Sequence, residues 1–242
     1  VDMCHLPFIP MPDTYPVYPS RMQFVHYLQS YQRMLGLDVR LRTCVTRAAK
    51  TPDGRWEVHA HDAERGQTVV YRSSVLVIAN GMFTKAHIPE IPGRDSYKGQ
   101  VLHSSEYKTG AAFAGGRVLV VGMGNSGAEI ACDLWEQGAR PTILQRSPSP
   151  LIPRWLVGVT QQVLYRPLWQ AALERDPALF WEVVDAVHLW LVRRSFGDVE
   201  ALGLQLSDRP PVKGWRDMFS AATMDIGTVE LVRRKENDIV KE

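Results

Sequence analysis

The sequence predicts an α/β protein with at least one parallel βαβ unit. An apolar run at Val118–Val121 leads into a glycine-rich turn, a helical pattern follows, and a second apolar run lies at Thr142–Leu144. This order is typical of two parallel strands joined by a helix. The chain has 242 residues, 45% of them hydrophobic and 22% charged, which is enough to bury a core and excludes a disordered tail.

The N-terminal part of the chain is expected to hold one helix and a small antiparallel sheet. Ser20 and Gln23 form a capping-box pattern, and apolar residues then recur at helical spacing until Gly36, which predicts a helix from Arg21 to Leu35. Alternating apolar and polar residues, separated by turn residues, predict three antiparallel strands at residues 39–49, 55–61 and 68–71.

Three further segments complete the expected order of elements. The continuous apolar run Val75–Ala79 has the form of a strand that is buried on both faces. Beyond Pro153 the chain shows Trp-rich helical patterns. The last apolar pieces, Val229–Val232 and Ile239–Val240, flank a charged turn and predict a hairpin whose continuation is missing. Together with a first residue that is Val1, this pattern favours an internal piece of a longer protein.

Charge and cysteine content narrow the class of protein. The 28 basic and 26 acidic residues leave a formal charge of +2, which argues against a nucleic-acid partner. Three cysteines without a CxxC pair, Cys4, Cys44 and Cys132, are typical of a reducing compartment, and we expect a cytoplasmic protein. The most apolar helical segment, Phe180–Val192, contains charged residues, so no membrane span is expected.

The glycine-rich turn carries the pattern GxGxxG over residues 122–127, directly between a buried strand and a helix. Gly122 would allow a sharp turn, Gly124 would let a pyrophosphate approach the backbone, and Gly127 would allow close packing of the helix on the strand. The phosphates would lie at the helix N-terminus, where free N–H groups and the helix dipole favour negative charge. This setting predicts a dinucleotide site rather than a plain glycine-rich turn.

The end of the second strand of this unit indicates which dinucleotide is preferred. An NAD site places an acidic residue about twenty positions after the first glycine, where it binds the ribose hydroxyls. Here the strand at residues 142–145 leads into Arg146 and Ser147, and no carboxylate is present. A cation and a hydroxyl suit the 2′-phosphate of NADP, and this register favours that role over a solvated surface arginine.

Four motifs, in a fixed order along the chain, resemble those of flavin-containing monooxygenases. Residues 97–107 (YKGQVLHSSEY) are similar to the family's identifying pattern FxGxxxHxxx(Y/F), with Tyr97 in place of Phe. Residues 16–28 resemble its YPxYPSRxQFxxYL segment, residues 122–131 its GxGNSGxEIA segment and residues 225–230 its DIGTVE segment. The chain is similar throughout to the plant auxin-forming branch and its bacterial relatives, and less to Baeyer–Villiger monooxygenases.

This resemblance implies an α/β architecture with two Rossmann-like dinucleotide-binding domains, an incomplete flavin domain and an inserted NADP domain. Residues 1–113 would form part of the FAD-binding domain, residues 114–222 the NADP-binding domain with a helical insertion, and residues 223–242 the start of the return to the FAD domain. The sequence holds one GxGxxG and no FATGY-like segment near its C-terminal end. We therefore expect these residues alone to be inactive and to hold no tightly bound flavin.

The family's activity implies the cofactors FAD and NADP, a small-molecule substrate and molecular oxygen. NADPH would reduce the flavin, and oxygen carried as a C4a-hydroperoxyflavin would pass to a soft nucleophile at N or S. The auxin-forming branch instead decarboxylates an indole keto acid. The cofactor supplies this chemistry, so no catalytic side chain is expected.

The expected cofactor-binding residues join the glycine fingerprint to positions that the resemblance implies. They are Gly81, His103, Gly122, Gly124, Asn125, Ser126, Gly127, Glu129, Arg146 and Ser147. Gly81 follows an apolar run and would approach FAD, or would simply end a strand. His103 is interpreted as fixing the domain junction by hydrogen bonds rather than as a general base. Glu129 would contact nicotinamide or ribose, or would interact with the helix dipole.

Other functions stay open at this point. No metal is expected, because the pair His59 and His61 lacks further ligands nearby and is better explained as an exposed strand face. A pyridine-nucleotide disulfide reductase shares the two-dinucleotide architecture, and the missing CxxC speaks against it. A stand-alone NADP-binding or regulatory module without turnover is the alternative from a different class.

Overall fold

The structure is a computed structural model that describes residues 5–81, 83–156, 159–160, 177–207 and 222–241. The chain divides into two compact units, Val1–Lys85 and Ala86–Glu242, and each is described by itself. The domain boundaries implied by the resemblance, at residues 113 and 222, stay a prediction.

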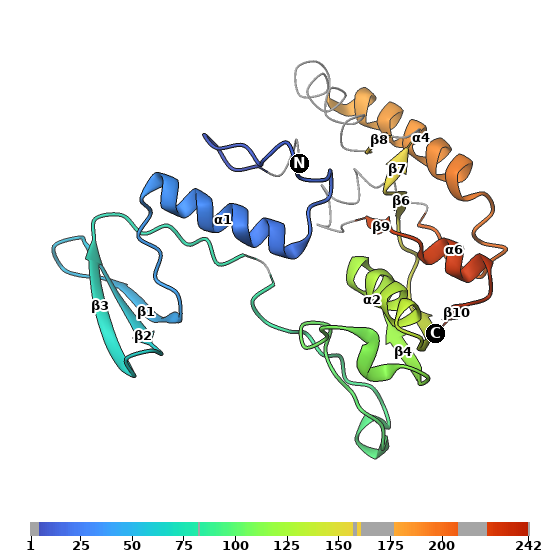
Figure 1. The fold of residues 1–242 in the computed structure, drawn as a ribbon, viewed down its shortest axis with the longest axis horizontal. Helices are drawn as coiled ribbons and strands as arrows, with labels where there is room; N and C mark the ends of the chain where they lie inside the picture. The colour runs from blue at the N-terminus through green and yellow to red at the C-terminus, as the bar shows by residue number, and fades with distance from the viewer. Residues whose placement is uncertain (1–4, 82, 157–158, 161–176, 208–221, 242) are drawn as a thin grey trace. The chain divides into compact units, whose positions relative to one another are not determined.

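Helix α1, Arg21–Leu35, opens the first unit with the bounds that the sequence predicts (Figure 1). The Ser20 hydroxyl accepts a hydrogen bond from the Gln23 N–H at 3.2 Å, and the Gln23 side chain accepts one from the Ser20 N–H at 2.8 Å. This reciprocal pair satisfies two helix-start donors. Gly36 ends the helix at a φ of 61°, a left-handed conformation that glycine adopts at little cost.

The three expected antiparallel strands are confirmed. They are β1 (Thr43–Lys50), β2 (Trp56–Asp62) and β3 (Gln67–Ser73), and β2 is central in the order β1-β2-β3. Val58 of β2 lies opposite Ala48 of β1 and Tyr71 of β3. The ladder is irregular between Val45 and Arg47, where β1 carries an extra residue.

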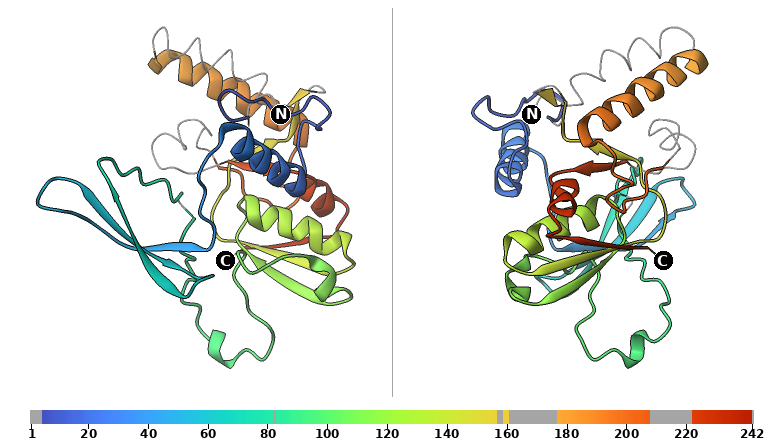
Figure 2. Two further views of the ribbon diagram at one scale, coloured as in Figure 1. Left: turned by 60° about the vertical axis from the view of Figure 1, so that its left-hand side comes forward. Right: turned by 90° about the vertical axis from the view of Figure 1, so that its right-hand side faces the viewer.

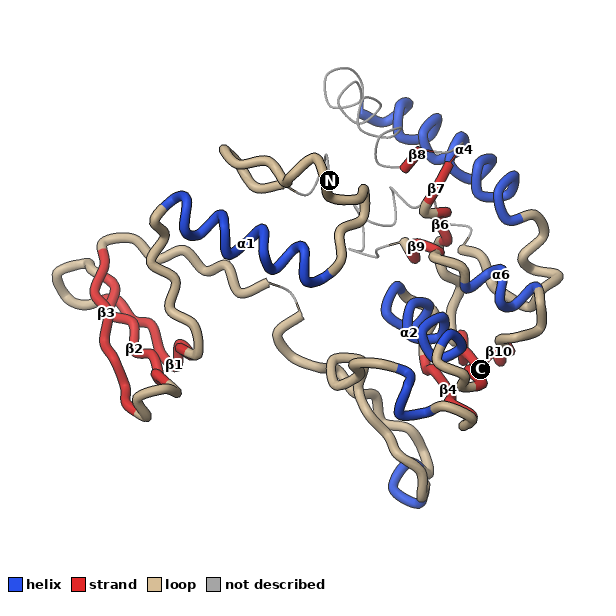
Figure 3. The backbone as a smooth tube through the Cα atoms, viewed as in Figure 1, coloured by secondary structure: helices blue, strands red, loops and turns tan. Residues whose placement is uncertain are grey.

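The prediction of a buried strand at Val75–Ala79 is wrong in this structure. The segment forms no helix or strand, and Val75, Val77 and Ile78 are 71%, 78% and 78% exposed. Figure 3 draws it as loop after the end of β3. An apolar run becomes a buried strand only where neighbouring strands pair with it and other elements cover its faces. Among the described residues, no strand pairs with this run.

The second unit is built on a three-stranded parallel sheet. The βαβ pattern predicts two of these strands, and the third is not expected from it. Strands β4 (Arg117–Val121), β5 (Arg140–Gln145) and β10 (Asp238–Lys241) lie in the order β10-β5-β4, and both pairs are parallel. Helix α2, Asn125–Glu136, joins β4 to β5 and packs on both strands. Figure 2 shows this helix lying along the sheet.

The core of the second unit forms where α2 meets this sheet. Ala128, Ala131 and Leu134 of α2 are fully buried, and Ile143 of β5 is buried with them. The two alanines let the helix lie close to the strands, and Leu134 fills the space that remains. The core therefore fixes the position of α2, whose first residues form the second half of the glycine fingerprint.

Further helices and strands complete the described part of the second unit. Two single-turn helices precede β4, Arg94–Ser96 and Gly110–Phe113. The remaining elements among the described residues of the unit are β6 (Leu151–Pro153), β7 (Trp155–Leu156), β8 (Val159–Thr160), α4 (Pro177–Phe196), β9 (Thr223–Asp225) and α6 (Thr228–Arg233). Helix α4 confirms part of the Trp-rich helical prediction, and the rest of it lies outside the described residues. No described helix is both long and apolar enough to cross a membrane.

The predicted closing hairpin is also wrong. Val229–Val232 lies in helix α6, and Ile239–Val240 lies in β10, which runs parallel to β5. A four-residue apolar run fits a buried helical turn as well as a strand, and periodicity cannot separate the two. Here Val229, Leu231 and Val232 are all buried on the helix. The chain therefore closes with a helix and a third parallel strand.

Candidate functional site: the carboxyl edge of the parallel sheet

Two glycines shape the turn between β4 and α2 as the sequence predicts. Gly122 has a φ of 107°, a backbone conformation that side-chain-bearing residues rarely adopt. A Cβ on Gly127 would overlap the carbonyl oxygen of Gly122, because the first turn of α2 lies directly on the end of β4. The turn and the close helix packing expected at these two glycines are thus present, and their part in binding a dinucleotide stays a prediction.

The start of α2 is open. Gly124 occupies the N-cap position, and no side chain caps the helix there. A Cβ on Gly124 would have no atom of the described residues within 4 Å, and Ser126, the second residue of α2, is exposed. The first N–H groups of an α-helix have no partner within the helix. This end of α2 therefore offers amide donors and a positive dipole end to an anion.

The Asn125 side chain is engaged by strand β9. Its Nδ2 donates to the Ala222 carbonyl oxygen at 3.1 Å, and its Oδ1 accepts the Met224 N–H at 2.7 Å. The Thr223 hydroxyl between these two residues donates to the Met123 carbonyl oxygen at 2.9 Å. The Asn125 side chain, which we expected to bind cofactor, thus links the glycine turn to β9 by hydrogen bonds. The spacing of residues within the fingerprint does not predict this role.

Arg146 and Ser147 follow the last residue of β5 and are exposed. Among the described residues, no hydrogen bond or ion pair holds Arg146. Strands β4 and β5 are parallel, so the turn after β4 and the segment after β5 lie at the same edge of the sheet. The structure therefore brings an open helix start and an exposed cation to the edge where ligands of such sheets bind.

The other three expected site residues are Glu129, Gly81 and His103, and Gly81 belongs to the first unit. Glu129 is exposed and is the fifth residue of α2, so it lies beyond the first turn. The effect of the helix dipole is largest within the first turn. Gly81 is exposed, with a left-handed φ of 71°. The His103 ring accepts the Ser105 N–H at Nδ1, at 3.2 Å, and its backbone N–H donates to Glu106 Oε2 at 2.8 Å. These His103 contacts stay within one local turn.

Sequence reasoning missed Asp133, a residue of α2. One of its carboxylate oxygens, Oδ2, accepts hydrogen bonds from the Tyr107 hydroxyl and from the Gly110 N–H. Burial, followed by the bond to Asp133, raises the pKa of Tyr107 above its usual value. The Tyr107 ring stacks on Phe113 at a centroid distance of 6.2 Å. The last residue of the 97–107 motif therefore anchors the segment before β4, here called the linker, to α2. No local sequence pattern predicts this long-range contact.

The 225–230 motif has a structural role as well. Asp225 Oδ1 accepts the Val229 N–H at 3.0 Å at the start of α6. Burial raises the pKa of Asp225, and hydrogen bonds from backbone N–H groups of α6 partly offset that effect. The Thr228 hydroxyl donates to the Ala128 carbonyl oxygen at 3.1 Å and lies 3.2 Å from Cys132 Sγ. The motif fixes α6 against the back of α2.

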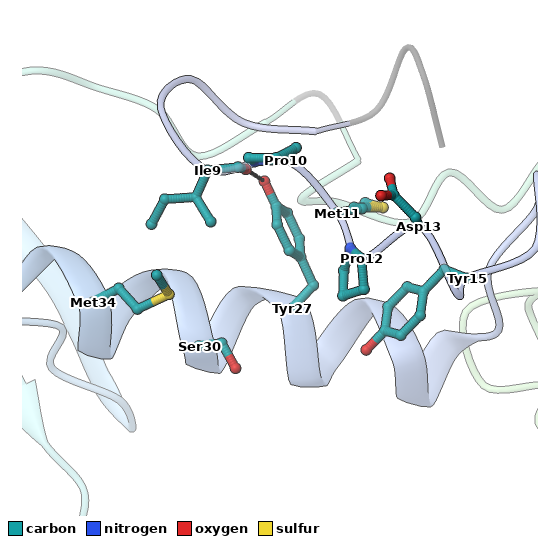
Figure 4. Close-up of a pocket in the computed structure, with 9 residues that line it drawn as sticks. All are labelled: Ile9, Pro10, Met11, Pro12, Asp13, Tyr15, Tyr27, Ser30 and Met34. Atoms are coloured by element: carbon teal, nitrogen blue, oxygen red, sulfur yellow. Dashed lines mark hydrogen bonds between the residues drawn. The ribbon is translucent and has the colours of Figure 1, made fainter.

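A shallow pocket of about 330 Å³ lies in the first unit, between the N-terminal loop and α1 (Figure 4). Its lining consists of Ile9, Pro10, Met11, Pro12, Asp13, Tyr15, Tyr27, Ser30 and Met34. The buried Tyr27 hydroxyl donates to the Ile9 carbonyl oxygen and accepts the Leu6 N–H, both at 2.7 Å. These bonds hold the loop on the helix, and none of the expected cofactor-binding residues lines the pocket.

The described residues contain no group of three or more His, Cys, Asp or Glu side chains that could hold a metal ion. His59 Nε2 lies 3.0 Å from Glu57 Oε1, and the same carboxylate pairs with Arg72. Arg72 thus forms a cross-strand ion pair with Glu57, and His59 lies within hydrogen-bond distance of the same carboxylate. Such pairs are common on half-exposed sheet faces.

A parallel βαβ unit with a glycine turn and an uncapped helix start at its carboxyl edge defines a dinucleotide-binding protein of the Rossmann type. Residues 2–187 match the family described as flavin-binding monooxygenase-like, and the chain belongs to that family. The resemblance drawn from the four motifs is thereby confirmed, and so is the Rossmann-type α/β fold class.

Curated relatives agree with this assignment. The chain is 34% identical over 232 residues to a probable indole-3-pyruvate monooxygenase, YUCCA1, of Arabidopsis thaliana, covering 95% of this chain and 53% of that protein. It is 35% identical over 249 residues to the indole-3-pyruvate monooxygenase YUCCA4 of Oryza sativa subsp. japonica, covering 98% and 54%. The chain thus spans about half the length of the curated relatives it matches.

Solved structures show the same fold. A mutant flavin monooxygenase from Stenotrophomonas maltophilia is 31% identical, with a TM-score of 0.57 over 68% of this chain and 46% of that one. A complex of OTEMO with FAD and NADP reaches a TM-score of 0.62 over 92% of this chain and 51% of that one. At 20% identity, the second likeness supports the fold alone.

Proposed function

We propose that residues 114–222, together with the β9–β10 region, form the NADP-binding part of an NADPH-dependent flavin monooxygenase. One observation carries the proposal: the open N-terminus of α2 and the exposed Arg146 lie at the same edge of one parallel sheet. The helix start suits the pyrophosphate, and the guanidinium suits a 2′-phosphate. The absence of a carboxylate at the end of β5 favours NADP over NAD.

Individual residues would hold the dinucleotide in defined ways. The backbone N–H groups of Asn125, Ser126 and Gly127 would face the pyrophosphate, and the bare face of Gly124 would let it approach. The Ser126 and Ser147 hydroxyls are exposed near those positions and could accept or donate hydrogen bonds. Asn125 would act through its side-chain contacts with β9, which hold the turn in shape.

The oxygenation chemistry would come from a flavin, which the family description names, and we propose that this flavin is FAD. When bound, FAD would accept hydride from NADPH and activate molecular oxygen. The small-molecule substrate would be a soft nucleophile at N or S, or an indole keto acid such as the curated relatives' names indicate. Gly81 and His103 remain proposed cofactor neighbours from the family resemblance, and a cytoplasmic location stays a prediction.

The two alternative functions receive less support. A bacillithiol disulfide reductase from Bacillus cereus shares the fold at 20% identity and a TM-score of 0.52, which concerns the fold alone. The chain lacks the CxxC pair that we expect of a pyridine-nucleotide disulfide reductase. No observation favours a stand-alone regulatory module over the enzyme.

Calorimetric titration of the 242-residue chain with NADP and NAD tests the dinucleotide proposal. We expect tighter binding of NADP, and we expect Arg146→Glu to remove the preference at a cost of about 1.5 to 3 kcal/mol, because a charge-assisted phosphate contact is lost. Arg140→Glu is the matched control, since Arg140 is exposed and starts the same strand at the opposite edge. Equal affinities in the unmutated chain would contradict the NADP assignment.

The monooxygenase proposal is tested in a protein that joins these residues to the family's remaining FAD-binding sequences. NADPH oxidation there should yield an oxygenated product from an amine, a thioether or indole-3-pyruvate. Gly124→Val should abolish flavin reduction by NADPH but leave reduction by dithionite intact, because the new side chain would block the pyrophosphate. Reduction of disulfides or quinones without any oxygenated product would contradict the proposal.

A further inference from the structure

The last residue of β5, Gln145, carries a buried side chain at the ligand edge of the sheet. It is 1% exposed, whereas its neighbours Arg146 and Ser147 are exposed. A buried amide must find hydrogen-bond partners, because an unpaired polar group in the interior is costly. The partners of Gln145 therefore show what this end of the strand is built to hold.

All the hydrogen bonds of the Gln145 side chain go to backbone groups of two loops. Its Nε2 donates to the Gln205 carbonyl oxygen at 2.9 Å and to the Ser147 carbonyl oxygen at 3.3 Å. Its Oε1 accepts the Gln205 N–H at 2.9 Å. The Gln145 amide thus binds both the backbone N–H and the backbone carbonyl of Gln205, and it also binds the Ser147 carbonyl.

The loop around Gln205 is itself firmly placed. The Ser149 N–H donates to the Gln205 carbonyl oxygen at 3.1 Å, and the Ser207 N–H donates to the Ser149 carbonyl oxygen at 3.2 Å. Leu204, beside Gln205, is 1% exposed and belongs to the hydrophobic core. Gln145 therefore connects the segment that follows β5 to a fixed part of the protein.

We propose that Gln145 is a positioning residue that sets the preference for NADP over NAD by fixing the path of Arg146 and Ser147. This inference rests on the proposed dinucleotide function. Gln145 occupies the strand end where an NAD site carries its acidic residue, but its side chain points into the protein. Arg146 is instead the exposed residue at this edge. Its guanidinium reaches the 2′-phosphate only if Gln145 holds the backbone of residues 146–147 in place.

Binding titrations of three variants with NADP and NAD test this role. Gln145→Leu removes all three hydrogen bonds at similar volume. We expect the ratio of NADP to NAD affinity to fall roughly two- to tenfold, with the NAD affinity unchanged, because the pyrophosphate cradle at α2 is untouched. Thr228→Val is the control, because it removes the buried hydrogen bond from Thr228 of α6 to the Ala128 carbonyl of α2. It should lower thermal stability and leave the affinity ratio unchanged.

Gln145→Glu separates positioning from direct contact and gives a second arm should the Leu variant fail to fold. It keeps the acceptor for the Gln205 N–H but sets a carboxylate oxygen against two carbonyls, so we expect a similar fall in the NADP to NAD ratio. A rise in NAD affinity in this variant would overturn the proposal, since it would mean that residue 145 faces the ribose.

The outcomes distinguish this inference from the function on which it rests. If the unmutated chain shows no NADP preference, the proposed function fails. If the unmutated chain prefers NADP and the folded Gln145 variants keep that ratio, or if Thr228→Val lowers it equally, the positioning role is refuted. A lower ratio in the Gln145 variants alone supports it.

Discussion

Two apolar runs of nearly the same composition have opposite fates in this protein. Val118–Val121 forms the body of strand β4 and pairs in parallel with β5 under helix α2. The sequence predicts a strand at Val75–Ala79 as well, yet that run forms none, and Val77 and Ile78 are each 78% exposed. The two runs differ in the segments that come after them rather than in their own residues.

The difference shows what turns an apolar run into a strand. After Val121 the chain supplies a glycine turn, a helix with a small-residue face and a partner strand within about thirty residues. After Ala79 it enters a loop, and among the described residues no strand pairs with the run. Apolar composition makes burial favourable, but the neighbours that bury a run must come from elsewhere in the fold.

The strongest test of this comparison lies in the glycine turn. Gly127→Ala should destabilise the βαβ unit by about 3 kcal/mol or more, because its Cβ overlaps the Gly122 carbonyl and backbone must move. Gly124→Ala is the matched control, since a Cβ there meets no atom within 4 Å. Chemical denaturation should show a large loss for the first variant and little for the second. Equal losses would mean that α2 does not depend on close contact with β4.

The anchor between the linker and α2 should give the next largest effect. Asp133→Ala leaves the Tyr107 hydroxyl and the Gly110 N–H without their shared acceptor, so we expect a loss of about 1 to 3 kcal/mol. Tyr107→Phe removes only one of the two bonds and should cost less. Thermal unfolding of both variants measures this order, and a larger loss in Tyr107→Phe would contradict it.

The free energy of unfolding should depend on pH because Asp225 is buried and its pKa is raised. Its pKa is raised by burial, so its contribution to stability is fully present below the unfolded pKa of about 4 and is lost as pH rises through the folded value. Asp225→Asn cannot ionise and keeps an oxygen to accept the Val229 N–H. Relative to the unmutated chain, this variant should therefore gain stability between pH 4 and pH 7. An unchanged difference across that range would show that burial does not govern this carboxyl.

The smallest effect is expected in the exposed run. Ile78→Ser should change the free energy of unfolding by no more than about 0.5 kcal/mol, because the side chain already meets solvent. Val120→Ser in β4, where the side chain is buried, is the matched comparison and should cost several times more. A large loss in Ile78→Ser would show that the run is covered in solution.

Local signals predict much of the fold. The capping box at Ser20 and the left-handed Gly36 define both ends of α1, and the strand–glycine–helix order defines the βαβ unit. The predictions that fail depend on distant partners: the fate of Val75–Ala79, and the helical rather than strand form of Val229–Val232. Each is a short apolar run, whose form is decided by the elements that pack on it.

The candidate site divides in the same way. Gly122 and Gly127 act through their own backbone and immediate neighbours, so their roles could be predicted. Asn125 and Gln145 act through hydrogen bonds to segments 60 or more residues away in sequence, and a single sequence does not contain that pairing. Asp133 was missed for the same reason, since its partners belong to the linker.

Peptide-resolved hydrogen exchange of the 242-residue chain, with and without NADP, tests most directly the claim that the carboxyl edge of the parallel sheet is a preformed dinucleotide site. We predict that NADP slows exchange over residues 122–127 and 145–147, while residues 75–79 exchange rapidly in both states because they are exposed and unpaired among the described residues. Protection by NADP that spares the glycine turn, or that falls on residues 75–79 instead, would contradict the account.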